Sequence, residues 1–151
     1  GRENDIIGDK VHAFTLALMV TKDFPQLRQA IYSQMKNSFS VPYTAFRVWG
    51  LRQSAGEAEF APVDEDIRQF TNSLGEPYCG PLPLEAVNNW FTTPGCDPQS
   101  VVLIPLRKDN RPFGLLALAS DDPNRFVQGM GTLFVERMGE IVAAALVHRA
   151  G

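Results

Sequence analysis

Residues 100–120 decide the fold: the apolar segments SVVLIPL (100–106) and FGLLALAS (113–120) flank the polar turn RKDNRP (107–112). Two apolar segments joined by a short polar turn are typical of an antiparallel β-hairpin. Because both segments are continuously apolar instead of alternating, we expect both faces of the hairpin to be covered, at the centre of a sheet. Pro105 cannot donate a hydrogen bond to a neighbouring strand, so we expect a strand end or a bulge there.

The composition fits one globular domain and argues against two classes of partner. The chain has 151 residues, of which 44% are hydrophobic, and a net charge of −3. This mild acidity argues against non-specific nucleic-acid binding and against attachment to an anionic membrane surface, since both need clustered basic residues. No apolar run approaches the roughly 20 residues that cross a bilayer, and the first residues lack the layout of a secretory signal. We therefore expect a cytoplasmic protein.

Two helices are predicted before the first strand. Apolar residues at four-three-four spacing predict the first helix, over 5–21; they are Ile7, Val11, Phe14 and Leu18. Asp23 is the expected N-cap of the second helix, with Pro25 in its first turn and Gln26 completing a partial capping box. This helix should end near residue 40, because Pro42 disfavours helix in the residue before it. Its expected buried side chains are Phe24, Leu27, Ile31 and Met35.

The middle of the chain alternates short predicted strands and helices. In a strand over 43–49, one face should carry Thr44, Phe46 and Val48, and the other Tyr43, Ala45, Arg47 and Trp49. After a polar connection over 51–57 we expect a second strand over 58–63 and a helix over 64–74 ended by Gly75. An extended piece over 77–81, a helix over 84–91 and a loop over 92–99 should follow.

A long helix over 130–149 closes the chain. One predicted apolar stripe consists of Met130, Phe134, Met138, Ile141 and Ala145, and a second, of mainly small residues, consists of Gly131, Val135, Gly139 and Ala143. Since glycine within a helix costs about 1 kcal/mol relative to alanine, two glycines on one face indicate the close approach of another backbone. The elements together predict an α+β fold, with the N- and C-terminal helices on one face of an antiparallel sheet and the middle segment on the other.

Several short motifs carry a resemblance to a known family. They are Cys79-Gly80, IPL at 104–106, GLLA at 114–117, DPNRF at 122–126, MGT at 130–132, Phe134 and Gly139-Glu140. Over nearly the whole chain these motifs resemble the bacterial family of domain of unknown function 484, and the paired strands are similar to the central strands of a GAF domain. The resemblance implies a GAF-like domain over 23–151, preceded over 1–22 by a helix that continues a longer upstream helix. That family has no assigned activity.

GAF domains that bind ligands hold them between the sheet and the middle segment, so the resemblance implies a pocket there. The strand alternation directs Arg47 toward that side, where a partly buried guanidinium needs an anionic partner. We expect Arg47 to bind a carboxylate or phosphate of a small anionic ligand, with apolar walls supplied by Trp49, Tyr78, Trp90 and Phe91. The favoured alternative is that Arg47 pairs internally, or stays exposed to solvent; the candidate internal partners are Glu57, Glu59 and Asp64.

Arg125 and Cys79 are further candidates for this pocket. Arg125 could reach an anion at the rim, but a turn contact with Asp122 or with a carbonyl group is favoured. Some GAF domains use cysteines to reduce free methionine sulfoxide, which needs an attacking thiol and a resolving partner, here Cys79 and Cys96. The two cysteines do not show that enzyme's arrangement, so a small buried residue at 79 and an incidental loop thiol at 96 are favoured. A disulfide between them is a further alternative, although a chain without a secretory signal favours free thiols.

The sequence predicts a non-enzymatic, GAF-like regulatory or small-molecule-sensing module, with no cofactor assigned. One alternative is a protein-interaction scaffold whose pocket is filled by its own side chains, such as Trp90 and Phe91. A thiol-based methionine sulfoxide reductase is the other. No metal site is expected, because His12 and His148 lie on the two terminal helices, away from acidic or cysteine clusters. GAF-like modules commonly pair through such helices, so the resemblance also implies a homodimer. The alternative is that the apolar stripes of the first and last helices pack within the subunit.

Overall fold

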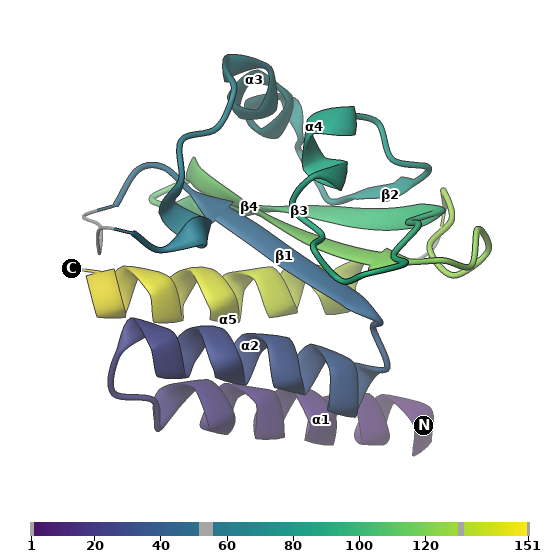
Figure 1. The fold of residues 1–151 in the computed structure, drawn as a ribbon. Helices are drawn as coiled ribbons and strands as arrows, with labels where there is room; N and C mark the ends of the chain where they lie inside the picture. The colour runs from purple at the N-terminus through teal and green to yellow at the C-terminus, as the bar shows by residue number, and fades with distance from the viewer. Residues whose placement is uncertain (1, 52–55, 130–131, 151) are drawn as a thin grey trace.

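The computed structural model describes residues 2–51, 56–129 and 132–150 and has one sheet between two layers of helices (Figure 1). In chain order the elements are α1 (Arg2–Met19), α2 (Phe24–Phe39), β1 (Tyr43–Val48), the 3-10 helix η1 (Ala58–Phe60), α3 (Glu65–Ser73), β2 (Tyr78–Gly80), α4 (Glu85–Asn88), β3 (Ser100–Lys108), β4 (Arg111–Ser120) and α5 (Leu133–Ala150). The sheet is antiparallel, with strand order β1-β4-β3-β2. The predicted α+β fold is confirmed.

The hairpin β3–β4 forms the centre of the sheet, as predicted, and its strands are longer than expected. The turn consists only of Asp109 and Asn110, whose φ angles of 53° and 64° place both in the left-handed region. These residue types tolerate that conformation, which a tight two-residue hairpin turn requires. Pro105 does not end the strand, because β2 pairs with β3 only as far as Leu103 and leaves that edge unpaired at residue 105. The expected irregularity is a register shift just beyond it, between Leu106 and Arg107.

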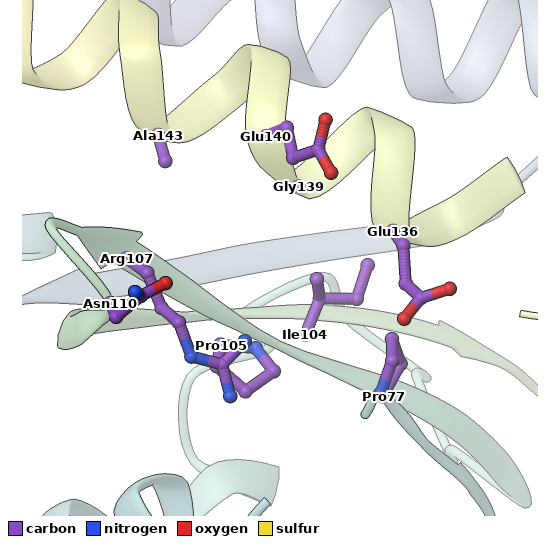
Figure 2. A pocket seen from close by; sticks show the side chains of 9 residues that line it. All are labelled: Pro77, Ile104, Pro105, Arg107, Asn110, Glu136, Gly139, Glu140 and Ala143. Atoms are coloured by element: carbon purple, nitrogen blue, oxygen red, sulfur yellow. The ribbon is translucent and has the colours of Figure 1, made fainter. Parts of the chain in front are cut away.

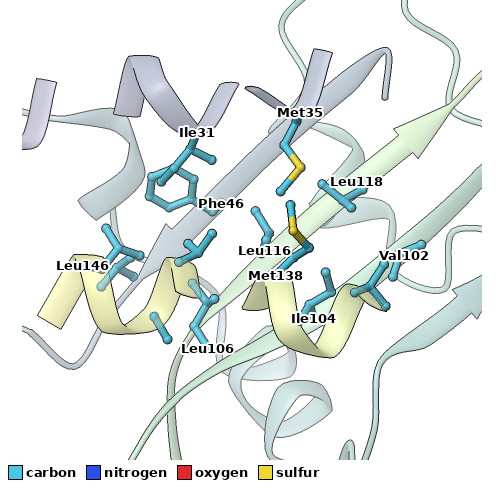
Figure 3. Packing of buried hydrophobic residues seen from close by; sticks show 14 of the residues in the cluster. Ile31, Met35, Phe46, Val102, Ile104, Leu106, Leu116, Leu118, Met138 and Leu146 are labelled. Atoms are coloured by element: carbon cyan, nitrogen blue, oxygen red, sulfur yellow. The ribbon is translucent and has the colours of Figure 1, made fainter. Parts of the chain in front are cut away.

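One face of the sheet is covered by α2 and α5, and α1 lies on the same side, one layer further out (Figure 1). Figure 3 shows the core between them, where Phe46 and Leu116 of the sheet meet Ile31 of α2 and Met138 of α5. In α2 all four predicted side chains are buried, and the Asp23 side chain accepts a hydrogen bond from the Gln26 backbone N–H at 2.9 Å. The predicted N-cap is therefore confirmed.

The burial of α1 differs from the predicted stripe. Phe14 and Leu18 are buried and Val11 is half-buried, but Ile7 is 43% exposed. The ring of Phe14 already contacts Phe39, the last residue of α2, with ring centroids 5.9 Å apart. Ile7 lies two turns earlier and so extends beyond the end of α2, where the described part of the chain covers it only in part.

The stripe of small residues on α5 is the one that faces the sheet. Buried positions are Val135, Met138, Gly139, Val142, Ala143 and Leu146, whereas Phe134, Ile141 and Ala145 are only partly buried. The predicted close approach of another backbone at Gly139 is confirmed only in part: a Cβ there would first meet a side chain, Cγ2 of Ile104, at 2.5 Å. The carbonyl oxygen of Pro105 on β3 lies further off, 3.9 Å from that Cβ position. Met130 and Gly131, which were assigned to these stripes, lie outside the described residues.

The opposite face of the sheet is covered by the middle segment, as predicted. Ile67 of α3, together with Val87 and Trp90 from α4 and the turn after it, packs against Leu103 and Leu115. The helix predicted over 64–74 is confirmed as α3, and the extended piece over 77–81 as β2. The helix predicted over 84–91 is a single turn, α4.

The second strand predicted over 58–63 is wrong, because residues Ala58–Phe60 form the 3-10 helix η1. This tight turn brings the carboxylates of Glu57 and Glu59 to the same guanidinium, that of Arg28 on α2. It also packs the Phe60 ring on Phe24, with centroids 4.8 Å apart. In a strand, by contrast, Glu59 and Phe60 would point to opposite faces.

Candidate functional site

A cavity of about 340 Å3 lies along the free edge of β1, between α2, η1 and the turn that follows α4. Three of the predicted ligand-binding residues line it together: Arg47, Trp90 and Phe91. We call it the Arg47 cavity. Its volume lies at the lower end of the range of about 300–1,000 Å3 typical of small-molecule sites.

Arg47 enters this cavity from β1 as a half-buried cation without a carboxylate partner. Its Nη1 donates a hydrogen bond to the carbonyl of Phe46 at 2.8 Å, and its guanidinium lies over the Trp90 ring, 5.1 Å from the centroid. Within the described part of the chain, no carboxylate lies within ion-pair distance of it. Burial lowers the pKa of Arg47, as expected for a cation whose hydration is only partly replaced. An anion bound here would restore that missing charge partner.

The expected internal partners of Arg47 are instead held by Arg28. The Arg28 guanidinium pairs with Glu57 and also donates to Oε1 of Glu59 at 3.3 Å. The hydrogen bond with Glu57 is the main reason that the pKa of Arg28 is raised. Glu59 is only 6% exposed, and its Oε2 accepts a hydrogen bond from the hydroxyl of Tyr32 at 2.7 Å. Burial and this bond raise the pKa of Tyr32 well above its usual range, so Tyr32 stays a neutral donor.

Aromatic side chains from the segment directly after α4 form a further wall of the cavity. Trp90 is 9% exposed and holds the Arg47 guanidinium on its face, an arrangement that favours a cation. Phe91 is half-buried and packs edge-on against Tyr43, with centroids 6.5 Å apart. The Tyr43 hydroxyl is engaged outside the cavity, by Asp121 at 2.6 Å. The cavity therefore combines two cations, the half-buried Arg47 and the exposed Lys36, with one buried acid and an aromatic wall.

Two other predicted wall residues, Trp49 and Tyr78, lie on the same face of the sheet but outside this cavity. Trp49 follows β1 and has the guanidinium of Arg68 over its ring at 5.9 Å. Tyr78 is on β2, at the opposite edge of the sheet, where it packs against Phe70 with centroids 6.1 Å apart and donates to the carbonyl of Pro81. The structure thus does not bring them together with Arg47.

Cys79 faces the side of the sheet that α2 and α5 cover, because successive residues of a strand point to opposite faces and Tyr78 points to the other one. It packs in the cluster that contains Val102, its partner on β3. Both cysteines are free. Burial is the main reason that the pKa of each thiol is raised, with a further contribution from Glu76 at Cys79 and from Asp121 at Cys96. A raised pKa lowers the thiolate fraction that nucleophilic chemistry needs.

Arg125 is exposed on the loop after β4, away from the Arg47 cavity. Its Nη2 donates to the carbonyl of Phe39, the last residue of α2, at 3.1 Å. The guanidinium also lies over the Phe126 ring, 4.8 Å from the centroid. The favoured contact with a carbonyl group is therefore the one observed, although it joins the loop to α2 instead of closing the turn at Asp122.

A second hollow, of about 250 Å3, lies between β3 and α5 (Figure 2). Glu136 and Glu140 line it from the helix, and Arg107 lines it from the strand. The Arg107 guanidinium donates to the carbonyl of Leu74, so this cation already has a partner. This hollow lacks the free cation and the aromatic wall that distinguish the Arg47 cavity.

Tyr32, Lys36 and Thr44 also line the cavity, which the sequence pattern did not predict, and Glu59 was expected only as a partner of Arg47. Tyr32 and Lys36 occupy positions i+4 and i+8 from Arg28, one step around α2 from its buried stripe. That polar stripe on α2 was the sequence pattern from which these cavity residues could have been predicted. Its meaning depended on η1, which was predicted as a strand.

Among the residues that the structure describes, no helix has the length and apolar character needed to cross a membrane. Likewise, the described side chains include no group of three or more His, Cys, Asp or Glu residues placed to hold a metal ion.

Comparisons with known proteins agree with this architecture. Residues 1–149 match the model of a family described as "Protein of unknown function, DUF484". The structure is similar to the GAF domain of the potassium sensor histidine kinase KdpD from Escherichia coli, with a TM-score of 0.56, 16% identity and coverage of 93% of this chain and 92% of that one. It is also similar to the GAF domain of an Acinetobacter phosphoenolpyruvate-protein phosphotransferase, with a TM-score of 0.61, 10% identity and the same coverage of both chains. A search of curated proteins finds no significant match.

Proposed function

Because this chain belongs to the DUF484 family of proteins of unknown function and has a GAF-like fold, we propose that it is a non-enzymatic regulatory module that senses a small anionic ligand. GAF domains are typically small-molecule-sensing regulatory modules, and both similar structures come from signalling or phosphotransfer proteins. At these low identities the likeness establishes the fold alone. The ligand proposal therefore depends on the Arg47 cavity.

The observation that carries this proposal is the half-buried Arg47 guanidinium beside a cavity, without an anionic partner among the described residues. A cation in such a place is stabilised when a carboxylate or phosphate binds it, by about 1.5–3 kcal/mol for a charge-assisted hydrogen bond. Trp90 holds the guanidinium in place, which lowers the entropy lost on binding.

Native mass spectrometry of the full chain, purified without denaturation, tests the proposal. We expect a bound small molecule in the wild-type protein that is lost in Arg47→Gln. The matched control is Arg68→Gln, because Arg68 also lies over a tryptophan, Trp49, but does not line the cavity. Absence of any bound molecule in the wild-type protein, or its retention in Arg47→Gln, would contradict the proposal.

A second candidate function is a protein-interaction scaffold, and one observation favours it. The space over the centre of the sheet is filled by Ile67, Val87 and Trp90, all buried, which leaves the cavity at the edge. A scaffold would carry no small molecule in the mass spectrum, and a protein partner would bind the Arg47→Gln variant as well as the wild type.

We also propose that the module pairs as a homodimer through its terminal helices. An apolar hollow of about 420 Å3 lies between α1 and α5; Met19, which lines it, is 68% exposed, and the next residue, Val20, is 75% exposed. Light scattering after size exclusion should give a dimer that Met19→Glu converts to a monomer. Val127→Glu, an exposed apolar position in a loop, should leave the dimer intact. A monomeric wild-type protein would overturn this pairing.

A further inference from the structure

The acidic wall of the Arg47 cavity carries a negative charge that the protein neutralises only in part. Two carboxylates, Glu57 and Glu59, share the single guanidinium of Arg28, so this cluster has a net charge of −1. Arg28 engages Glu57 more closely and reaches Glu59 at 3.3 Å. Glu59 is the carboxylate that lines the cavity, whereas Glu57 does not.

Glu59 retains hydrogen-bonding capacity on this wall. A carboxylate accepts up to about four hydrogen bonds, and Glu59 receives one from Tyr32 and one from Arg28 among the described residues. Because Glu59 is only 6% exposed, water satisfies its remaining lone pairs poorly. The neutral Tyr32 hydroxyl contributes a donor but no positive charge.

A positive charge occupies another wall of the same cavity. Arg47 and Glu59 both line it, yet they are not within ion-pair distance of each other. The negative charge of Glu59 still acts on Arg47, because it raises the pKa of Arg47, although burial lowers that pKa more strongly. The two charges therefore face one cavity without neutralising each other by contact.

We propose that the ligand is a small zwitterion of amino-acid size, whose carboxylate binds Arg47 and whose ammonium group binds Glu59. This inference rests on the proposed ligand-sensing function and adds the ammonium group and the role of Glu59. A molecule with both charges contacts Arg47 and Glu59 at once. Lys36 also lines the cavity, but it is exposed and makes no ion pair with Glu59 among the described residues, so a simple anion leaves Glu59 without a cation beyond the shared Arg28. Trp90 and Phe91 supply an apolar wall for its side chain. The cavity of about 340 Å3 suits a molecule of this size.

The test uses thermal unfolding of the full chain with each of the twenty standard amino acids at millimolar concentration. We expect at least one to raise Tm in a concentration-dependent way, because a ligand that binds only the folded state stabilises it. Two analogues of the best binder follow, one lacking the ammonium group and one lacking the carboxylate. Each should bind roughly 10-fold or more weakly, the loss expected for one charged hydrogen bond.

Variants then assign the ammonium contact. In Glu59→Gln the amino acid should no longer bind more tightly than the analogue without the ammonium group. In Glu57→Gln, whose substituted side chain lies outside the cavity, the amino acid should still bind more tightly than that analogue. If the analogue without the ammonium group binds wild-type protein as tightly as the amino acid, the zwitterion is wrong and the anion-sensing function stands. If no amino acid raises Tm, the zwitterion is also wrong, and the mass spectrum separately decides whether any ligand binds. The wild-type comparison stays decisive even if Glu59→Gln fails to fold.

Discussion

Two glycines inside helices have opposite surroundings, and substitution by alanine should separate them. A Cβ at Gly8 on α1 meets no atom within 4 Å, so Gly8→Ala should raise the free energy of unfolding by about 0.5–1 kcal/mol. A Cβ at Gly139 would lie 2.5 Å from Cγ2 of the buried Ile104, so Gly139→Ala should lower it by about 1–3 kcal/mol. Denaturant unfolding measures both values. Equal stabilisation by the two substitutions would show that α5 does not approach β3 this closely.

All three tyrosines have raised pKa values, which makes alkaline stability predictable. The pKa of Tyr43 rises to about 12, chiefly through its hydrogen bond to Asp121, and burial is the main cause for Tyr32 and Tyr78. In the unfolded chain tyrosine ionises near pH 10, so above about pH 10 the folded state holds phenolic protons that the unfolded state loses. Stability from these groups is complete below pH 10 and falls as the pH rises toward 12.

Absorbance titration of tyrosinate should therefore show little ionisation in the folded protein at about pH 10. Tyr43→Phe should make unfolding less sensitive to pH between about 10 and 12, because it removes one of the groups whose ionisation is linked to folding. A tyrosine ionisation midpoint near the ordinary value in the folded protein would contradict the burial of Tyr32 and Tyr78 and the hydrogen bond from Tyr43 to Asp121.

At the scale of elements, the N-termini of α2 and α3 provide a matched pair. Asp23 caps α2 with a side-chain hydrogen bond to the Gln26 N–H, whereas Asp64 occupies the same position at α3 without one. Asp23→Ala should lower the free energy of unfolding by about 1 kcal/mol, and Asp64→Ala by only a few tenths. Chemical denaturation measures the difference. Equal losses would mean that the cap hydrogen bond contributes nothing beyond the charge.

The elements predicted well from the sequence are those that local physics determines. The hairpin β3–β4 follows from continuous hydrophobicity around a polar turn, and α2 from its cap and periodic apolar face. The error at η1 has a different origin. A 3-10 turn over Ala58–Phe60 is favoured by the ion pairs of Glu57 and Glu59 with Arg28, about 30 residues earlier in the chain, and no local pattern reveals that contact.

The candidate site was predicted only in part, because local patterns determine some of its residues and tertiary contacts determine the others. Strand alternation correctly placed Arg47 on the face opposite the core residue Phe46, with Trp90 beside it. The same alternation on β2 separates Cys79 from Tyr78, but that strand is three residues long and its register is determined by pairing with β3. Whether Arg47 or Arg28 would pair with Glu59 depends on how η1 packs against α2, which is tertiary information.

At the scale of the whole molecule, Arg149 joins the end of α5 to the end of α1. Its Nη2 donates to the carbonyls of Met19 and Thr21, the first at 3.3 Å, and so caps α1 at its C-terminus. Arg149→Ala should speed amide hydrogen exchange in the last turns of α1. Arg137→Ala, at an exposed position that only reaches Glu140 at 3.8 Å, should not change it. Unchanged exchange in Arg149→Ala would show that the capping contact is dispensable.

This link between α1 and α5 also sets an order in time for the growing polypeptide. Thr21 and Arg149 are separated by 128 positions in the sequence. At about 5–20 residues per second, a ribosome needs roughly 6 to 26 s to synthesise the segment between them. During that interval α1 has neither its cap nor the helix that helps to bury Phe14 and Leu18. Although α1 is synthesised before α2 and α5, it is therefore among the last of the described helices to be completed, and part of its apolar side is available to chaperones in the meantime.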